Sequence, residues 1–241
     1  MTTIADIEDV LTRSPASGGV RHGRIAGDGI TMQASLWRVD PGAEALIRIP
    51  QTSDGYFFVL TGTGSADDGA RPQPLKPAVF AIAAEGSEIR IANDGGDSLD
   101  FLHIVSPPAG SRAVIDGYKG PLKLVPAETV GLAHEPENKK KRAFFVGPKA
   151  IPSGRAEGMI VHYEKDTITR PHFHPDADSI FVILEGELEF TNNREEGTIR
   201  PGQAVFINQG HRHGTRVTPG HDRAAFLEFH VPAKFQTIQD P

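Results

Sequence analysis

Cysteine is absent from this chain of 241 residues. Its absence excludes disulfides, iron–sulfur clusters, thiolate zinc sites and a cysteine nucleophile. Any metal must therefore be held by nitrogen and oxygen ligands. Long apolar segments are also missing, because the longest purely apolar run is Ala78–Ala84. That run is far shorter than the roughly 20 residues of a transmembrane helix, so we expect no membrane span.

The charge of either sign is modest. The chain has 25 basic and 31 acidic residues, with a formal net charge of −6. A mildly acidic surface argues against a nucleic-acid or anionic-membrane partner, so we expect a small-molecule ligand. The acidic N-terminal segment 1–9 lacks the basic region of a secretory signal, and we expect a cytoplasmic protein.

Helical patterns are scarce as well. Ile4, Ile7 and Leu11 fit one amphipathic face and predict a short N-terminal helix over residues 3–12. Elsewhere the apolar runs are short, rich in Val, Ile and Phe, and separated by turn residues. With 26 Gly and 19 Pro, this pattern predicts an all-β protein built as sandwiches or barrels.

The two halves of the chain resemble each other. Residues 54–62 (DGYFFVLTG) match residues 178–186 (DSIFVILEG) at an offset of 124, and further matches follow in the same order. An ordered set of matches indicates an internal repeat. We predict two tandem copies of one β unit, over residues 1–115 and 116–241.

Histidine is concentrated in the second half, which holds eight of the 10 in the chain. His172 and His174 are two residues apart, and on a strand such residues face the same side. His211 and His213 form a second pair with the same spacing. If both strands line one barrel, three or four imidazoles converge on one cation in its interior.

These segments resemble a known family. Residues 170–186 resemble the first cupin motif, and residues 202–213 resemble the second. The matching residues are His172, His174, Gly186, Gly202, Gly210 and His213. The resemblance implies a compact bicupin: two tandem jelly-roll-like β-barrels, with a metal held by two motif-1 His, one motif-1 Glu and one motif-2 His. It also suggests a homodimer, since cupin edges commonly pair.

The sequence departs from the first motif at its glutamate. Ser179 occupies that position, and the adjacent Asp178 would point to the other face of the strand unless a bulge re-aims it. Either residue remains a possible extra ligand. We predict a site of three histidines, His172, His174 and His213, that binds one divalent transition metal per chain. Iron(II) is favoured, and zinc, manganese and nickel remain open.

The first half serves as an internal comparison. At the offset of 124, the three histidines and Ser179 correspond to Arg48, Pro50, Ile89 and Gly55. None of these binds a cation. We therefore interpret the first barrel as a degenerate copy with a structural role.

Three residues are candidates for acid–base catalysis near the metal. His162 precedes the first motif on the expected neighbouring strand, and His211 stands beside His213. Glu228 lies on the last strand and shares a face with His230 by strand alternation. An inward Glu228 would act as a base or orient a ligand imidazole.

Other residues are candidates for the pocket. Alternation from position 179 turns Phe181 and Ile183 inward as an apolar wall, which suits a small, partly apolar substrate. Arg170 would pair with a substrate carboxylate. The basic run at residues 139–142 is interpreted as a solvated loop or strand edge.

Three functions follow from this pattern. The favoured one is an iron(II) dioxygenase acting on a small bidentate substrate that resembles a diketone, a diol or a thiol. The second is a non-redox isomerase, cyclase or lyase that uses the divalent metal as a Lewis acid. The third is a non-catalytic, ligand-binding cupin.

Overall fold

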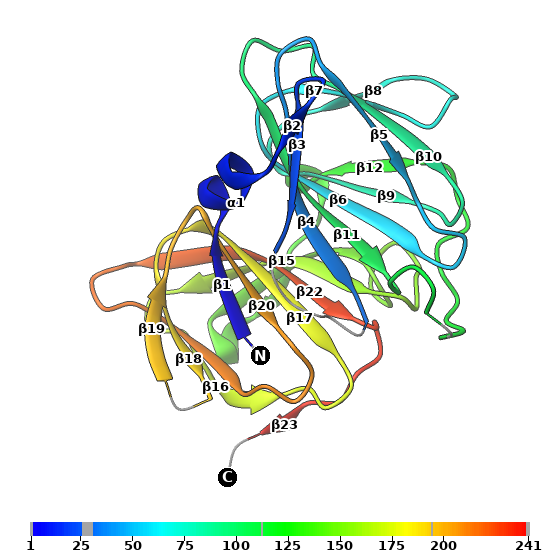
Figure 1. The fold of residues 1–241 in the computed structure, drawn as a ribbon. Helices are drawn as coiled ribbons and strands as arrows, with labels where there is room; N and C mark the ends of the chain where they lie inside the picture. Colours follow the sequence, from blue (N-terminus) through cyan, green and yellow to red (C-terminus); the bar gives the residue numbers. More distant parts are fainter. Residues whose placement is uncertain (1, 26–30, 112, 194, 240–241) are drawn as a thin grey trace.

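Two β lobes and one short helix make up the chain (Figure 1). The computed structural model describes residues 2–25, 31–111, 113–193 and 195–239. The helix α1 (Ile7–Arg13) is capped by the side chain of Asp6, which accepts a hydrogen bond from the backbone N–H of Asp9. The predicted helix over residues 3–12 thus begins too early. Ile4 belongs to β1 (Thr2–Asp6), because this segment pairs with a sheet edge that its local pattern does not reveal.

In the first lobe a seven-stranded sheet and a four-stranded sheet enclose an apolar core. The larger sheet has the order β12-β9-β6-β11-β4-β3-β2, and the smaller one has the order β5-β10-β7-β8. The strands of the larger sheet are β2 (Ala16–Ser17), β3 (Val20–Arg24), β4 (Gln33–Val39), β6 (Asp54–Thr61), β9 (Val79–Ala83), β11 (Leu99–Ser106) and β12 (Lys123–Pro126). Those of the smaller sheet are β5 (Glu44–Arg48), β7 (Gly64–Asp67), β8 (Gln73–Leu75) and β10 (Glu88–Ala92).

The second lobe repeats this arrangement. Its seven-stranded sheet has the order β1-β20-β17-β22-β15-β14-β13, and its five-stranded sheet has the order β19-β18-β21-β16-β23. The larger sheet adds to β1 the strands β13 (Ala133–Glu135), β14 (Lys140–Val146), β15 (Glu157–Glu164), β17 (Asp178–Glu185), β20 (Gln203–Ile207) and β22 (Arg223–Val231). The smaller sheet contains β16 (Ile168–Phe173), β18 (Leu188–Asn192), β19 (Glu195–Ile199), β21 (His213–Val217) and β23 (Ile238–Gln239). Two 3₁₀ turns, η1 (Ala127–Thr129) and η2 (Pro136–Asn138), flank β13.

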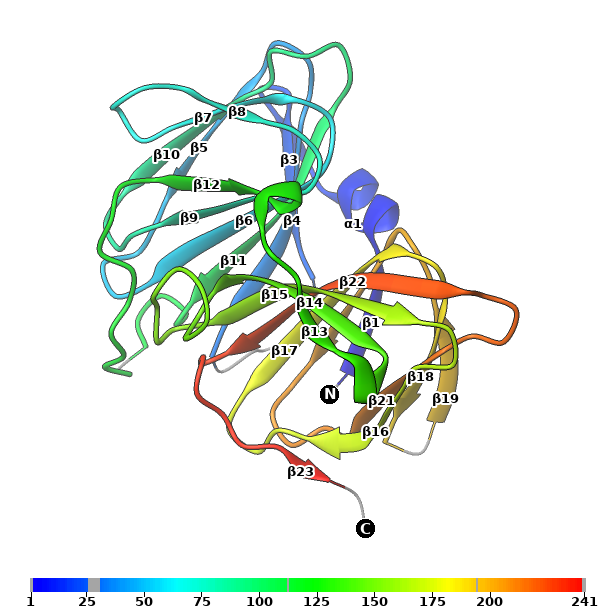
Figure 2. The same cartoon turned by 180° about the vertical axis from the view of Figure 1, so that it is seen from behind.

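The lobes exchange one strand each. β1, at the start of the chain, pairs with β20 at the edge of the second lobe. β12, which follows the connection between the halves, pairs in turn with β9 of the first lobe (Figure 2). In each seven-stranded sheet, one strand that would otherwise form an edge, β20 or β9, is thereby paired with a strand from outside its own repeat, which satisfies its backbone donors and acceptors.

A third apolar cluster joins the lobes. It draws on both seven-stranded sheets: Phe80 stacks on Phe145 at 5.0 Å between ring centroids, and Tyr56 packs on Phe229 at 5.7 Å. The central strands of these sheets are therefore buried on both faces, one toward their own lobe and one toward the other. This explains the near-continuous apolar runs of the sequence, which are typical of doubly covered strands.

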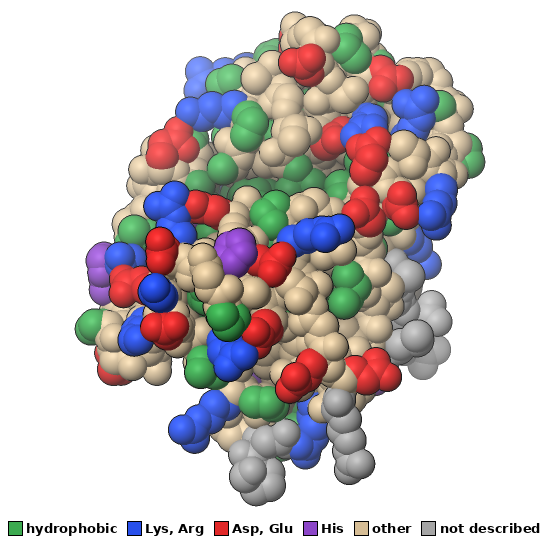
Figure 3. Space-filling view, turned by 90° about the vertical axis from the view of Figure 1, so that its left-hand side faces the viewer, with side chains coloured by type: hydrophobic (Ala, Val, Ile, Leu, Met, Phe, Trp, Pro, Cys, Tyr) green, Lys and Arg blue, Asp and Glu red, His purple; other side chains and the backbone are tan. Residues whose placement is uncertain are grey.

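The surface is mixed in charge. On the face in Figure 3, acidic and basic side chains are interspersed rather than gathered by sign. Among the residues that the structure describes, no helix has the length and apolar character required to cross a membrane.

One buried histidine makes the stability of the first lobe depend on pH. His103 is 5% exposed, stacks on Phe57 at 4.6 Å between ring centroids, and its Nε2 has no hydrogen-bond partner among the described residues. Burial lowers the pKa of His103 to about 3. Its ordinary value of about 6.5 applies in the unfolded chain, so the unfolded state binds the extra proton below that pH.

We therefore expect the free energy of unfolding to fall by about 1.4 kcal/mol per pH unit below pH 6.5 through His103 alone. Above pH 6.5 this contribution is fully present, and it is lost progressively toward pH 3. Urea unfolding of the wild type and of His103→Leu at pH 7, 6 and 5 measures it. In the variant, the free energy of unfolding should change less with pH, because the contribution of His103 is removed. An equal dependence on pH in both proteins would contradict the prediction.

Candidate metal centre

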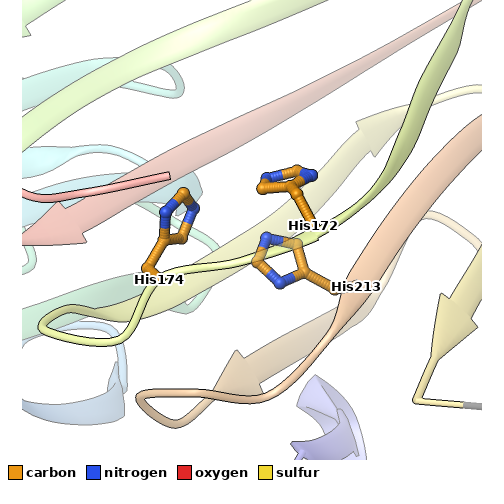
Figure 4. Close-up of side chains that lie close together, drawn as sticks. All are labelled: His172, His174 and His213. Atoms are coloured by element: carbon orange, nitrogen blue, oxygen red, sulfur yellow. The ribbon is translucent and has the colours of Figure 1, made fainter. Parts of the chain in front are cut away.

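Three buried imidazoles converge inside the second lobe (Figure 4). His172 lies on β16, His174 follows that strand directly, and His213 begins the neighbouring β21. One ring nitrogen from each lies within 4.8 Å of those of the other two. Within the described ranges, no other group of three His, Asp or Glu residues converges in this way.

Backbone carbonyls fix the tautomer of each ring. The Nδ1 atoms of His172, His174 and His213 donate to the carbonyl oxygens of Arg170 at 2.9 Å, Gln236 at 2.9 Å and His211 at 3.1 Å. Because a carbonyl only accepts, Nδ1 carries the proton and Nε2 keeps its lone pair. The Nε2 atoms of His174 and His213 are buried without a hydrogen-bond partner among the described residues. Three preoriented nitrogen donors, two of them buried without a hydrogen-bond partner, fit a divalent transition metal.

The surroundings keep the three rings neutral. Burial lowers the pKa of His213 to about 3 and that of His174 to about 4, and it lowers the pKa of His172 in the same direction. Only the neutral imidazole can ligate a metal, so the site is in its binding form at neutral pH.

A β-bulge places His172 in the interior. Pairing between β16 and β21 matches Thr169 with Thr215 and His172 with His213, so β16 carries one extra residue between them. In the first lobe the corresponding strands, β5 and β10, pair Ile47 with Ile89 and show no such shift. The predicted equivalence of His172 with Arg48 and of His174 with Pro50 is therefore wrong by one residue.

The true counterparts of the three histidines are Ile47, Ile49 and Ile89, all packed in the core of the first lobe. Arg48 points outward to a surface ion pair with Glu88. Gly55, the counterpart of Ser179, lies so close to Ile49 that an added Cβ would stand 2.3 Å from its Cδ1. Apolar side chains thus fill the space that the three histidines occupy in the second lobe.

Ser179 faces a histidine rather than the three-imidazole site. Its hydroxyl is hydrogen-bonded to Nδ1 of His230 at 2.9 Å, and Nε2 of His230 lies 3.2 Å from a carboxylate oxygen of Glu228. Burial alone would raise the pKa of Glu228, but the neighbouring His230 lowers it to about 2. An ionised carboxylate paired with an imidazole therefore lines the same cavity as the three histidines.

Asp178 connects the two lobes instead of binding a metal. It is fully buried, and one carboxylate oxygen accepts hydrogen bonds from the backbone N–H of Thr31 at 2.8 Å and from the hydroxyl of Thr31 at 2.7 Å. The other accepts from the N–H of Gln209 at 3.1 Å, in the loop before His213. As strand alternation suggested, the side chain points to the face opposite Ser179.

Replacing Asp178 with alanine should lower the free energy of unfolding by about 3 kcal/mol, because three donors to a buried carboxylate lose their acceptor. Thr31→Val, which removes the hydroxyl that donates to the Asp178 carboxylate and accepts from the Asp178 backbone N–H, should cost about 1 kcal/mol. Both measurements are urea unfolding curves of the metal-free protein. Metal bound per folded chain should stay unchanged in Asp178→Ala; a loss of metal without a loss of stability would instead identify Asp178 as a ligand.

Three predicted side chains lie outside the cavity. His162 lies on the face of β15 opposite Met159, Val161 and Tyr163, which line it. The exposed Arg170 and the partly exposed His211 contribute only their carbonyl oxygens, through the hydrogen bonds to His172 and His213.

Of the two apolar residues predicted to line the pocket, only one does so. Phe181 lines the cavity, with its ring 5.8 Å from that of His213. Ile183 is buried in the core of the lobe and does not reach the cavity.

The cavity has a volume of about 320 Å³ and contains residues that the sequence did not indicate. Phe235 packs its ring 4.8 Å from His174 and 4.4 Å from His230, and β23 of the same C-terminal segment pairs with β16. Lys140 and Tyr163 form a polar wall. The prediction that the basic run at residues 139–142 is solvated is wrong for Lys140, which is only 9% exposed. Its inward direction follows from the pairing of β14 with β15, which local sequence does not reveal.

Comparison with known proteins agrees with this geometry. The family model of the cupin domain matches residues 159–230, which contain the three histidines. A glyoxylate-induced protein from Pseudomonas aeruginosa superposes with a TM-score of 0.77 over 98% of this chain and 90% of its own, at 14% identity. Oxalate decarboxylase from Lactobacillus farciminis has a TM-score of 0.71, covering 98% and 88% of the two chains at 11% identity. Residues 159–230 thus match the cupin domain, and the chain as a whole has the fold of cupin proteins.

The cupin core also resembles one curated protein in sequence. The tetracenomycin polyketide synthase protein TcmJ of Streptomyces glaucescens is 32% identical over 63 residues. That match covers 25% of this chain and 42% of TcmJ, so the chain spans less than half the length of this relative.

Proposed function

We propose that this cupin is a metal-dependent enzyme acting on a small molecule, with one divalent transition metal held by His172, His174 and His213. The observation that carries the proposal is the set of neutral, preoriented imidazoles, two of them with unpartnered Nε2 atoms, beside a cavity of about 320 Å³. The cavity is large enough for a small organic substrate.

The donor set favours a substrate that becomes anionic. Three neutral ligands leave the full charge of a divalent cation uncompensated, so a deprotonated, bidentate diketone, diol or thiol would complete the site. A bound divalent metal supplies Lewis acidity and, as iron(II), activation of dioxygen. Glu228 is placed to accept the substrate proton, with His230 stabilising its carboxylate form. We therefore propose an iron(II) dioxygenase.

A non-redox isomerase, cyclase or lyase is the second candidate. The Glu228–His230 pair favours it, because proton transfer next to a Lewis acid needs no dioxygen. The sequence similarity to TcmJ, a polyketide synthase protein, is consistent with a small-molecule substrate for either reaction.

Oxygen uptake distinguishes these functions. The metal-free protein is reloaded with iron(II), manganese(II) or zinc(II) and assayed with diketones, diols and thiols. Substrate-dependent oxygen consumption with iron(II) alone supports the dioxygenase. Substrate conversion without oxygen, also with zinc(II), supports the non-redox enzyme. Binding without conversion in every form would contradict the proposal and indicate a ligand-binding cupin.

A further inference from the structure

A continuous hydrogen-bonded wall lines the metal cavity. The ammonium group of Lys140 donates to Oγ1 of Thr169 at 2.5 Å, and the hydroxyl of Tyr163 is hydrogen-bonded to Thr169 and, at 2.9 Å, to Oγ1 of Thr215. All four side chains line the cavity that contains His172 and His213. The Lys140 nitrogen also lies 5.0 Å from the centroid of the Tyr163 ring.

The first lobe shows that the fold does not require this wall. Strand pairing equates Lys140 and Tyr163 with Val20 and Val39, which face each other across β3 and β4. Thr169 and Thr215 correspond in the same way to Ala45 and Ile91. These four counterparts are apolar, and all contribute to the core of the first lobe. Only the lobe with the three histidines replaces them with polar groups.

Burying this ammonium is costly, which points to a ligand. Lys140 is only 9% exposed, and burial lowers its pKa. Its hydrogen bond to Thr169 uses one of three N–H donors, so donors remain for a bound group.

The charges of the cavity indicate the sign of that group. Three basic side chains line it, Lys140, Arg142 and Lys149, against two acidic ones, Glu157 and Glu228, and Arg142 is already paired with Glu135. A divalent metal on neutral histidines would add two positive charges, so the occupied cavity favours an anion.

We propose that Lys140, supported by Thr169, Tyr163 and Thr215, binds a carboxylate of the substrate while the substrate's chelating oxygens face the three histidines. This inference rests on the proposed function and narrows the substrate class to small, metal-chelating carboxylates such as diketo acids. The ammonium contributes a charge-assisted hydrogen bond, which is worth roughly 10- to 100-fold in affinity.

Two related probes test the carboxylate subsite. Acetylacetone and acetopyruvate share the chelating 1,3-diketone, but only acetopyruvate carries a carboxylate. Calorimetric titration of the wild type should give at least tenfold tighter binding of acetopyruvate. Lys140→Met should weaken acetopyruvate roughly 10- to 100-fold and change acetylacetone less than twofold. Lys141→Met is the matched control, because Lys141 points outward to an ion pair with Glu164, and it should behave as the wild type.

A preference for acetopyruvate that survives Lys140→Met would overturn the inference, since the carboxylate would then bind elsewhere. Tyr163→Phe, which keeps the ammonium but removes a hydroxyl from the wall, provides a second variant should Lys140→Met fail to fold. It should lower the affinity for acetopyruvate about three- to tenfold. Unchanged affinity would contradict the proposed role of the hydrogen-bonded wall in carboxylate binding. Metal analysis of the same samples tests the proposed function separately. If no metal is found, the two probes are compared on the metal-free protein, and the dependence on Lys140 still decides the inference.

Discussion

Replacing His213 with alanine should lower the affinity for a divalent transition metal roughly a thousandfold, because a set of three ligands cannot hold the ion with two. His213 is 1% exposed, and its Nδ1 is fixed by the His211 carbonyl, so its Nε2 is held in place as the third nitrogen donor. Competition with a chromophoric chelator measures the loss directly. His172→Ala and His174→Ala should have effects of the same size.

His162→Ala is the matched control for this experiment. His162 is also a histidine of the second lobe, but its strand turns it away from the cavity. Metal affinity should stay within about twofold of the wild type, since none of the nitrogen donors changes. Full metal occupancy in His213→Ala would refute the three-histidine site.

Replacing Glu228 with glutamine should lower kcat by roughly 10²- to 10⁴-fold, the usual effect of removing a general base. The substitution keeps the shape of the side chain and removes only the charge, so metal content should not change. Since the pKa of Glu228 is about 2, its carboxylate is ionised from pH 4 upward, and the wild-type rate should show no acidic limb from this group between pH 5 and 8.

Glu185→Gln is the control for Glu228, because Glu185 pairs with Arg223 at the surface. Its kcat should remain within about twofold of the wild type. A Glu228→Gln enzyme with wild-type kcat would show that the proton is accepted elsewhere. Loss of metal in that variant would instead make Glu228 a ligand.

Local patterns in the sequence predicted the parts of the site that lie close together in the chain. His172 and His174 stand two residues apart, at the end of β16. His213 follows only after β17, β18, β19 and β20, but a second His-x-His motif marks its position. The all-β fold was predicted from short apolar runs and turn residues for the same reason. The repeat made these inferences stronger, since it supplied a second copy in which ligands and fold signals could be separated.

The features of the site that the sequence did not predict depend on which strands pair and in what register. The bulge in β16 shifts the equivalence of the two lobes by one residue, so Ile47 and Ile49, not Arg48 and Pro50, replace the histidines. The inward direction of Lys140 is set by its pairing with Tyr163. No sequence spacing links Lys140 or Tyr163 to the three histidines.

The C-terminal segment illustrates the same limit. Phe235 and Gln236 reach His174 only because β23 pairs with β16, which lies more than 60 residues earlier in the chain. His162 is the opposite case, a residue that the sequence indicated and the structure places outside the cavity. Its position before the first motif suggested a role, but alternation along β15 assigns the cavity face to Met159, Val161 and Tyr163.

Crystallographic anomalous scattering at the absorption edge of the metal present in the purified protein tests the central claim most directly. We expect one anomalous peak per chain, about 2.0–2.3 Å from the Nε2 atoms of His172, His174 and His213, with none in the first lobe. A peak among Ile47, Ile49 and Ile89, or one bound to Asp178 in place of these imidazoles, would contradict it.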